Sequence, residues 1–168
     1  MVKVFIQTFL LAFAMLAAPK VLAAAEQISK PVKPLPALSG SGHFADMEKG
    51  ELVIYQFWAS WCTGCGDVMM QLAKTLQNYP KIGYVSVSLD ESKDIALKFF
   101  ANKPEAAKFA MSKTYLDDSG KYFAEPSKVD GLPYIIVTKQ DGTVVKRFKG
   151  HPPQREIENL LKKGSSIK

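Results

Sequence analysis

The chain has 168 residues and a formal net charge of +6, from 22 basic and 16 acidic side chains. No block of five or more like charges occurs, and the interleaved basic residues are typical of a solvated surface, so we expect no nucleic-acid partner. The length suits one ordinary domain that can bury a core without several disulfides, so the two cysteines are not a structural framework.

Residues 1–25 have the layout of a secretory signal peptide. Lys3 precedes an apolar run over residues 4–18, which is short for a membrane span, and small residues at 23–25 form an A-x-A cleavage site. We predict cleavage after Ala25 and a periplasmic location for the folded part. The alternative is an uncleaved membrane anchor, the one way in which we expect the chain to contact a membrane.

The remaining chain divides into an extended lead-in at 26–43, a folded domain at 44–164 and a short tail at 165–168. The lead-in is rich in proline and glycine, which predicts an irregular segment lying across the domain surface. The domain opens with a near-continuous apolar run at 52–58, as expected of a buried central strand. Its last residue, Trp58, is predicted to lie in the core.

Helical and strand patterns then alternate along the chain. Apolar residues at helical spacing predict a helix that starts at Cys65 and stops at Tyr79, and β-branched and aromatic residues predict a strand at 82–89. A further helix follows, with Asp90 or Ser92 as its cap. This order forms a βαβ unit. The later elements are predicted as a helix at 106–112, a strand at 114–116, a hairpin of strands at 134–138 and 143–148, and a helix opened by Pro153 and ended by Gly164.

The two cysteines, Cys62 and Cys65, come directly after the buried strand. A disulfide across two intervening residues closes a small loop and removes little entropy from the unfolded chain, so it is a poor structural staple. A zinc site needs about four ligands, and His43 and His151 do not form a paired spacing with the cysteines. We therefore expect no metal and no cofactor, and we predict a redox-active pair.

Cys62 is predicted to be the attacking sulfur. At a helix N-terminus, unpaired N–H groups and the helix dipole stabilise the thiolate, which is the reactive species. Cys65, one helical turn further on, would attack Cys62 and release the reduced substrate. Trp61 precedes Cys62 and is predicted to form a partly exposed contact surface.

Residues 57–65, Phe-Trp-Ala-Ser-Trp-Cys-Thr-Gly-Cys, resemble the active-site segment of thioredoxin-like proteins, in particular the exported TlpA/ResA-like thiol-disulfide oxidoreductases. Residues 129–134 resemble the family's loop, in which a proline follows a cis peptide bond and faces the cysteines. The resemblance covers about residues 44–163. It implies an α/β protein with the thioredoxin fold, a central mixed β-sheet flanked by helices, and a short insertion before the cis-proline loop.

The resemblance also implies a set of site residues. These are the catalytic Cys62 and Cys65, the supporting Trp61, Thr63, Gly64 and Gln56, and the substrate-docking Leu132 and Pro133. A cis bond before Pro133 would expose the backbone of Leu132 for strand-like pairing with a substrate. His151 lies in a loop that is near the active site in this family, but a solvated loop histidine is the more ordinary interpretation.

The implied partners are protein thiols and disulfides. TlpA/ResA-like proteins are mostly reductases that a membrane thiol electron donor keeps reduced, and they often serve cytochrome c maturation. Our first hypothesis is therefore a reductase of disulfides in exported proteins that works through a mixed disulfide. A periplasmic disulfide oxidase or isomerase is the second hypothesis, and a thioredoxin-fold binding module without redox activity is a third.

Three residues depart from the family pattern. Gln56 stands where thioredoxins carry a buried aspartate that serves proton transfer, and glutamine cannot titrate. Val68 replaces a glutamate found in many TlpA/ResA-like proteins, and Gly64 replaces the usual proline between the cysteines. The neighbouring Asp67 would point to a different side of the helix and does not substitute for that glutamate. Proton transfer and redox potential are thus the features that transfer least.

Overall fold

The computed structural model describes residues 24–44 and 51–165. Most of the predicted signal segment and residues 166–168 of the predicted tail lie outside these ranges. Within the described ranges, no helix has the length and apolar character needed to cross a membrane.

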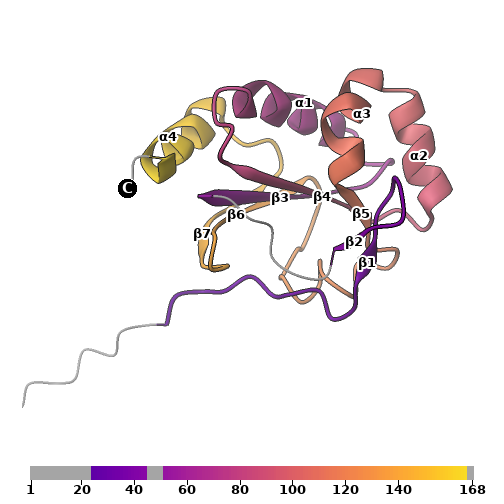
Figure 1. Cartoon of the computed structure of the whole chain (residues 1–168), viewed down its shortest axis with the longest axis horizontal. Coiled ribbons are helices and arrows are strands. Elements are labelled where there is room, and N and C mark those ends of the chain that lie inside the picture. The colour runs from indigo at the N-terminus through magenta and orange to yellow at the C-terminus, as the bar shows by residue number, and fades with distance from the viewer. Residues whose placement is uncertain (1–23, 45–50, 166–168) are drawn as a thin grey trace, which may run out of the picture.

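A five-stranded sheet forms the centre of the molecule, with the order β5-β4-β3-β6-β7 (Figure 1). Its strands are β3 (Leu52–Trp58), β4 (Gly83–Ser88), β5 (Thr114–Leu116), β6 (Tyr134–Lys139) and β7 (Val144–Lys149). Strand β4 runs parallel to both β3 and β5, whereas β6 is antiparallel to β3 and β7. This arrangement confirms the predicted α/β class and mixed central sheet.

Strand β3 lies in the middle of the sheet, and all seven of its residues are buried. The continuous apolar run explains this position, because the side chains of a central strand are buried on both faces of the sheet. Leu52, Ile54 and Trp58 join the core on one face, and Val53 and Tyr55 join the core on the other.

The four α-helices of the described residues lie on one face of the sheet (Figure 1). They are α1 (Cys65–Leu76), α2 (Lys93–Ala101), α3 (Pro104–Ala110) and α4 (Gln154–Ser165), and a 3₁₀ turn at Met111–Lys113 follows α3. The core on this face is apolar and draws on every helix. Its members include Ile54, Trp58, Met69, Leu72, Phe99, Phe100, Ile157 and Leu161.

Irregular chain, rather than helix, covers the opposite face. The centre of this cover is Phe123, which is fully buried and lies 5.3–5.7 Å, ring centroid to ring centroid, from Phe44, Tyr55 and Phe57. The buried carboxylate of Asp117 fixes the turn that carries Phe123, since it accepts hydrogen bonds from the backbone N–H groups of residues 122, 123 and 124 at 2.9–3.1 Å. A carboxylate thus supplies the backbone pairing that a helix would otherwise provide.

The lead-in completes this cover and is tied down at intervals (Figure 1). The N–H groups of Ile28, Val32 and Leu38 donate to backbone oxygens of residues 142, 122 and 114 at 2.8–2.9 Å. Between them lies a small antiparallel hairpin of β1 (Leu35–Pro36) and β2 (His43–Phe44). The lead-in therefore lies across the domain and buries part of its second core.

The structure corrects two local predictions and decides between the alternatives of a third. The helix predicted at 106–112 begins at Pro104, because proline is well suited to the first turn of a helix. Helix α4 continues past Gly164 to residue 165, and the glycine serves a close approach instead: an added Cβ would lie 2.2 Å from Cδ1 of Leu52. Asp90 and Ser92 are the two predicted caps of α2, and Ser92 is the cap in the structure, accepting a hydrogen bond from Ile95 N–H.

Candidate functional site

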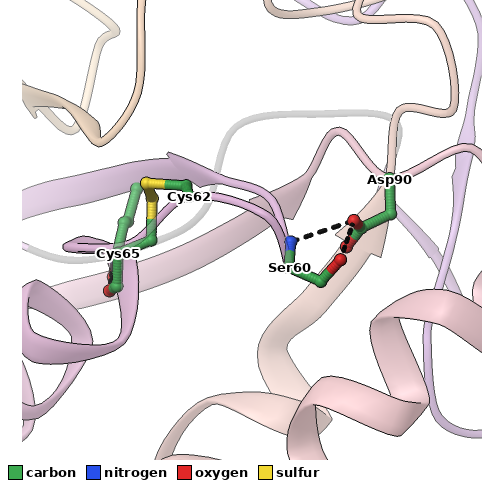
Figure 2. The surroundings of a disulfide bond; sticks show 5 residues. Ser60, Cys62, Cys65 and Asp90 are labelled. Carbon is green, nitrogen blue, oxygen red and sulfur yellow. Dashed lines mark hydrogen bonds between the residues drawn. A yellow bond between two sulfur atoms is a disulfide. The ribbon is translucent and has the colours of Figure 1, made fainter.

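The two cysteines lie on a tight turn that links β3 to α1. Cys62 N–H donates to Ala59 O at 3.1 Å and Cys65 N–H donates to Cys62 O at 3.2 Å, after which Val68 N–H donates to Gly64 O at 3.1 Å. The sulfurs form a disulfide (Figure 2). The strand therefore delivers Cys62 to the N-terminal end of α1.

The two sulfur-bearing residues differ in their access to solvent. Cys62 is 8% exposed, whereas Cys65 is fully buried. Trp61, next to Cys62, has 71% of its surface exposed, which is unusual for so large an apolar side chain. One cysteine thus reaches the surface beside an exposed aromatic ring, and the other faces the core.

The linking residues leave the helix terminus open. Thr63 is exposed, and Gly64 is the N-cap of α1 with no side-chain hydrogen bond to it. An added Cβ on Gly64 would meet no atom within 4 Å. The first N–H groups of α1 therefore have no side-chain cap, and a helix end of this kind favours a nearby negative charge.

Gln56 lies beneath the inner cysteine in a fully buried hydrogen-bonded chain. Its Nε2 donates to Cys65 O at 3.1 Å, and its Oε1 accepts from the Tyr84 hydroxyl at 2.7 Å. Burial raises the pKa of Tyr84 well above its ordinary range, against a smaller opposing effect of its hydrogen bond with Ser86. Neither Gln56 nor Tyr84 therefore changes its charge near neutral pH.

A buried carboxylate holds the segment just before the cysteines (Figure 2). Asp90, 1% exposed, accepts from Ser60 N–H at 2.9 Å and from the Ser60 hydroxyl at 2.7 Å, and its other oxygen accepts from Ser88 Oγ at 2.8 Å. Leu89 N–H also donates to Trp58 O at 2.8 Å. The end of β4 thus fixes the geometry of the turn that carries Cys62.

Trp58 anchors the helices to the end of β3. Its indole N–H donates to Ser86 Oγ at 2.7 Å, which satisfies its one polar group. Its ring lies 4.6 Å from that of Phe99 and 5.3 Å from that of Phe100, centroid to centroid. Helix α2 is thereby packed directly below the redox turn.

The proline loop lies at the same edge of the sheet. The Leu132-Pro133 peptide bond is cis, as the resemblance implies. Phe57 pairs with Tyr134, so this loop lies beside the end of β3 where the cysteine turn begins. Leu132 packs against the core cluster that contains both cysteines, and Pro133 is buried with its carbonyl accepting from Gly150 N–H at 2.8 Å.

The structure brings together most of the residues singled out by sequence. His151 directly follows Gly150, whose N–H donates to Pro133 O, but its side chain is exposed and has no described hydrogen bond. Val68 is buried and Asp67 is exposed, so they occupy different sides of α1. Within residues 24–44 and 51–165, no three His, Cys, Asp or Glu side chains are grouped to hold a metal ion.

Sequence reasoning missed Ser60, Tyr84 and the role of Asp90. A signal for Asp90 was present: it follows β4, which is parallel to β3, so the residues after both strands meet at one edge. No comparable signal marks Tyr84, because its hydroxyl meets Gln56 only through the register of two strands.

Comparison with known proteins agrees with this geometry. A family described as a thioredoxin-like domain matches residues 47–165. The thiol-disulfide oxidoreductase ResA of Bacillus thuringiensis (strain Al Hakam) is 28% identical over 116 residues, which are 68% of this chain and 64% of ResA. The chain thus spans slightly less than two thirds of the ResA relatives' length.

Solved structures give the same fold. A Chlorobium tepidum structure described as a DsbE thiol:disulfide interchange protein superposes with a TM-score of 0.69 at 25% identity, covering 84% of this chain and 99% of that one. A secreted Mycobacterium tuberculosis disulfide oxidoreductase superposes with a TM-score of 0.62 at 18% identity, covering 79% and 96%. These likenesses confirm the thioredoxin fold.

The Tyr84 hydroxyl is expected to matter for alkaline stability. Since its folded-state pKa lies above the unfolded value, its contribution is complete below pH about 10 and is lost as the pH rises through the folded pKa. The variant Tyr84→Phe leaves Gln56 Oε1 without a donor, so we expect it to lose about 1–3 kcal/mol of unfolding free energy at pH 7. When the pH is raised from 7 to 11, the unfolding free energy of Tyr84→Phe should fall by less than that of the wild type. Urea unfolding at both pH values measures the two decreases.

Tyr79→Phe is the matched control, because Tyr79 is only partly buried. An equal alkaline loss in Tyr84→Phe and in the wild type would contradict this account of the buried hydroxyl.

The contact between Asp90 and Ser60 is expected to stabilise the fold. Asp90→Ala removes the acceptor of three buried or partly buried donors, so we expect it to lose at least about 2 kcal/mol of unfolding free energy. Asp90→Asn keeps an oxygen for Ser60 and should lose less. Denaturant unfolding of the oxidised protein measures both losses, and an Asp90→Ala value within about 0.5 kcal/mol of wild type would show that the contact contributes little.

Proposed function

This chain belongs to the thioredoxin-like domain family, and we propose that it is a thiol-disulfide oxidoreductase that works through Cys62 and Cys65. The observation that carries the proposal is the asymmetry of the pair at the start of α1. Cys62 reaches the surface beside the exposed Trp61, whereas Cys65 is fully buried behind it.

The proposed reaction has two exchange steps. In the reduced protein, the Cys62 thiolate attacks a substrate disulfide, a new S–S bond joins enzyme and substrate, and one substrate sulfur leaves as a thiolate. Cys65, once deprotonated, then attacks the Cys62 sulfur, and the second substrate thiolate leaves. Two electrons pass to the substrate, the enzyme disulfide forms, and the two protons given up by the enzyme thiols balance those taken by the substrate thiols.

Within the described residues, the side chain that hydrogen-bonds to Cys65 belongs to Gln56, which is not an acid. Gln56 contacts Cys65 O and cannot take up a proton, and the raised pKa of Tyr84 keeps its hydroxyl protonated. We propose that the departing substrate thiolate or solvent takes the Cys65 proton. Gln56 then orients the inner cysteine through its backbone carbonyl rather than acting as a base.

Substrate docking is proposed at Trp61, Leu132 and Pro133. Trp61 offers an exposed apolar surface next to the attacking sulfur. Leu132 is half-buried against the core cluster that contains both cysteines. The strand that follows it, β6, pairs with the end of β3 through Tyr134 and Phe57. An extended substrate segment could pair with this backbone in the manner of an added strand.

We propose the reductive direction, with disulfides of exported proteins as substrates, cytochrome c maturation as the setting and a membrane thiol donor to restore the dithiol. The signal-like residues 1–25 support export and a periplasmic location. Within the described residues, Glu26 is the first with a described hydrogen bond to the domain, which supports a cut after Ala25. Glu26 O accepts from Val144 N–H at 2.7 Å, and the Glu26 carboxylate pairs with Arg147 at 3.1 Å and Lys128 at 3.3 Å. The hydrogen bond from Arg147 lowers the pKa of Glu26.

Single-cysteine variants test the roles of the two sulfurs. Cys65→Ser retains the accessible sulfur and lacks the one that resolves the adduct, so we expect it to accumulate a mixed disulfide with a disulfide-containing protein such as insulin. Cys62→Ser retains only the buried sulfur and should form little adduct. Electrophoresis without reductant measures both yields, and loss of the adduct on adding reductant identifies it as a disulfide.

The pair of variants also controls for folding, because each replaces one sulfur by oxygen in the same turn. An adduct that forms equally with Cys62→Ser, or with neither variant, would contradict the proposed mechanism. The second result would favour a binding module whose cysteines take no part in its activity.

A further inference from the structure

Gly66, directly after Cys65, has no side chain, and a lysine from another helix fills the space beside it. A Cβ added to Gly66 would lie 3.3 Å from Cδ and from Cε of Lys103, and 3.4 Å from Cζ of Phe99. The stem of Lys103 therefore crosses the first turn of α1, the helix that begins at Cys65.

The backbone of Lys103 is held firmly at this place. It is the N-cap residue of α3, its N–H donates to Phe100 O at 3.1 Å, and its carbonyl accepts from Ala107 N–H at 3.0 Å. Its ammonium nitrogen lies 5.9 Å from the centre of the Phe99 ring, which itself packs on Trp58. The cation is thus anchored to the same aromatic cluster that lies below the redox turn.

Lys103 is exposed, and its Cδ and Cε lie beside Gly66 in the first turn of α1. Its positive charge therefore adds to the positive end of the helix dipole at the N-terminal end of α1. Within the described ranges, Lys103 has no carboxylate within ion-pairing distance. A thiolate on Cys62, at the same end of α1, would be attracted by the dipole and by this charge.

Other charged groups of the described residues lie in the segments around the turn. Asp67, in the first turn of α1, is exposed to solvent, and Asp90 accepts hydrogen bonds from Ser60 and Ser88. In the neighbouring proline loop, Lys149 pairs with Asp130 at 3.0 Å. His151, in the loop after β7, is exposed.

We propose that Lys103 is an electrostatic positioning residue for the redox pair, which stabilises the Cys62 thiolate and with it the reduced form of the protein. This inference rests on the proposed thiol-disulfide exchange. Lys103 takes no part in bond making or breaking: the electrons still move only between the two enzyme sulfurs and those of the substrate. Gly66 is the partner feature, since a Cβ there would lie 3.3 Å from the lysine stem, a tighter contact than most and one that the glycine avoids.

Lys103→Met tests the charge separately from the packing, because methionine keeps an unbranched apolar stem. At a pH one unit below the wild-type Cys62 pKa, the alkylation rate of the reduced protein by iodoacetamide should fall about two- to fivefold, the size expected for one charge near a helix end. The Cys62 pKa, taken from the full pH profile, should rise accordingly. The difference between variant and wild type should shrink in about 1 M salt, where the Debye length is about 3 Å.

Two further variants separate charge from structure. Lys103→Arg keeps the cation and should behave like wild type. The double variant with Lys103→Ala and Gly66→Lys moves the cation onto α1 itself, and it should recover alkylation at least in part relative to Lys103→Ala alone.

Lys163→Met is the matched control for net charge. Lys163 precedes Gly164, which packs on Leu52 at the start of β3. Lys163 therefore lies at the opposite end of the central strand from Cys62. We expect it to leave the alkylation profile unchanged.

The outcomes distinguish this inference from the proposed function. A reactive wild type whose Cys62 profile is matched by Lys103→Met, or shifted equally by Lys163→Met, would overturn the role of Lys103 and leave the exchange function standing. A wild type whose Cys62 does not react with disulfides at all would overturn the exchange function itself, and the inference with it.

Discussion

Complete burial of β3 is the constraint on which the rest of the structure depends. A strand covered on both faces has to lie inside the sheet, with β4 parallel on one side and β6 antiparallel on the other. Its end then brings three things to one edge: the cysteine turn, the Asp90 carboxylate after β4 and the proline loop before β6. Chemistry at this edge is a consequence of how the strand is buried.

The two faces of the sheet are covered in different ways. On one face lie the described helices α1 to α4, and the aromatic contacts of α2 with Trp58 support the end of β3 from which the cysteine turn starts. On the other face, the lead-in and the turn around Phe123 cover the sheet without a helix, and Asp117 pairs the backbone groups that this irregular chain leaves over. The redox turn can therefore stay partly exposed, because the packing of Trp58 on α2 and the hydrogen bonds of Asp90 after β4 hold it in place.

Sequence predicted the features that local pattern encodes. The strand at 52–58 was placed correctly because its apolar run has no interruption, and the positions of the cysteines followed from it. What it did not predict depends on contacts between distant segments. The contact of Tyr84 with Gln56 depends on strand register, and the contact of Lys103 with Gly66 depends on the packing of α3 near α1. Neither contact produces a periodic pattern in the sequence.

The most direct test of the central claim is the redox equilibrium of the Cys62/Cys65 pair, read by alkylation after equilibration in glutathione or dithiothreitol buffers. The account predicts one two-electron transition in which both cysteines are protected together, within the range of roughly −270 to −120 mV spanned by related folds and near its reducing end. A potential near −120 mV would keep the exchange chemistry and contradict the reductive direction. Cysteines that fail to cycle at any potential would contradict the account as a whole.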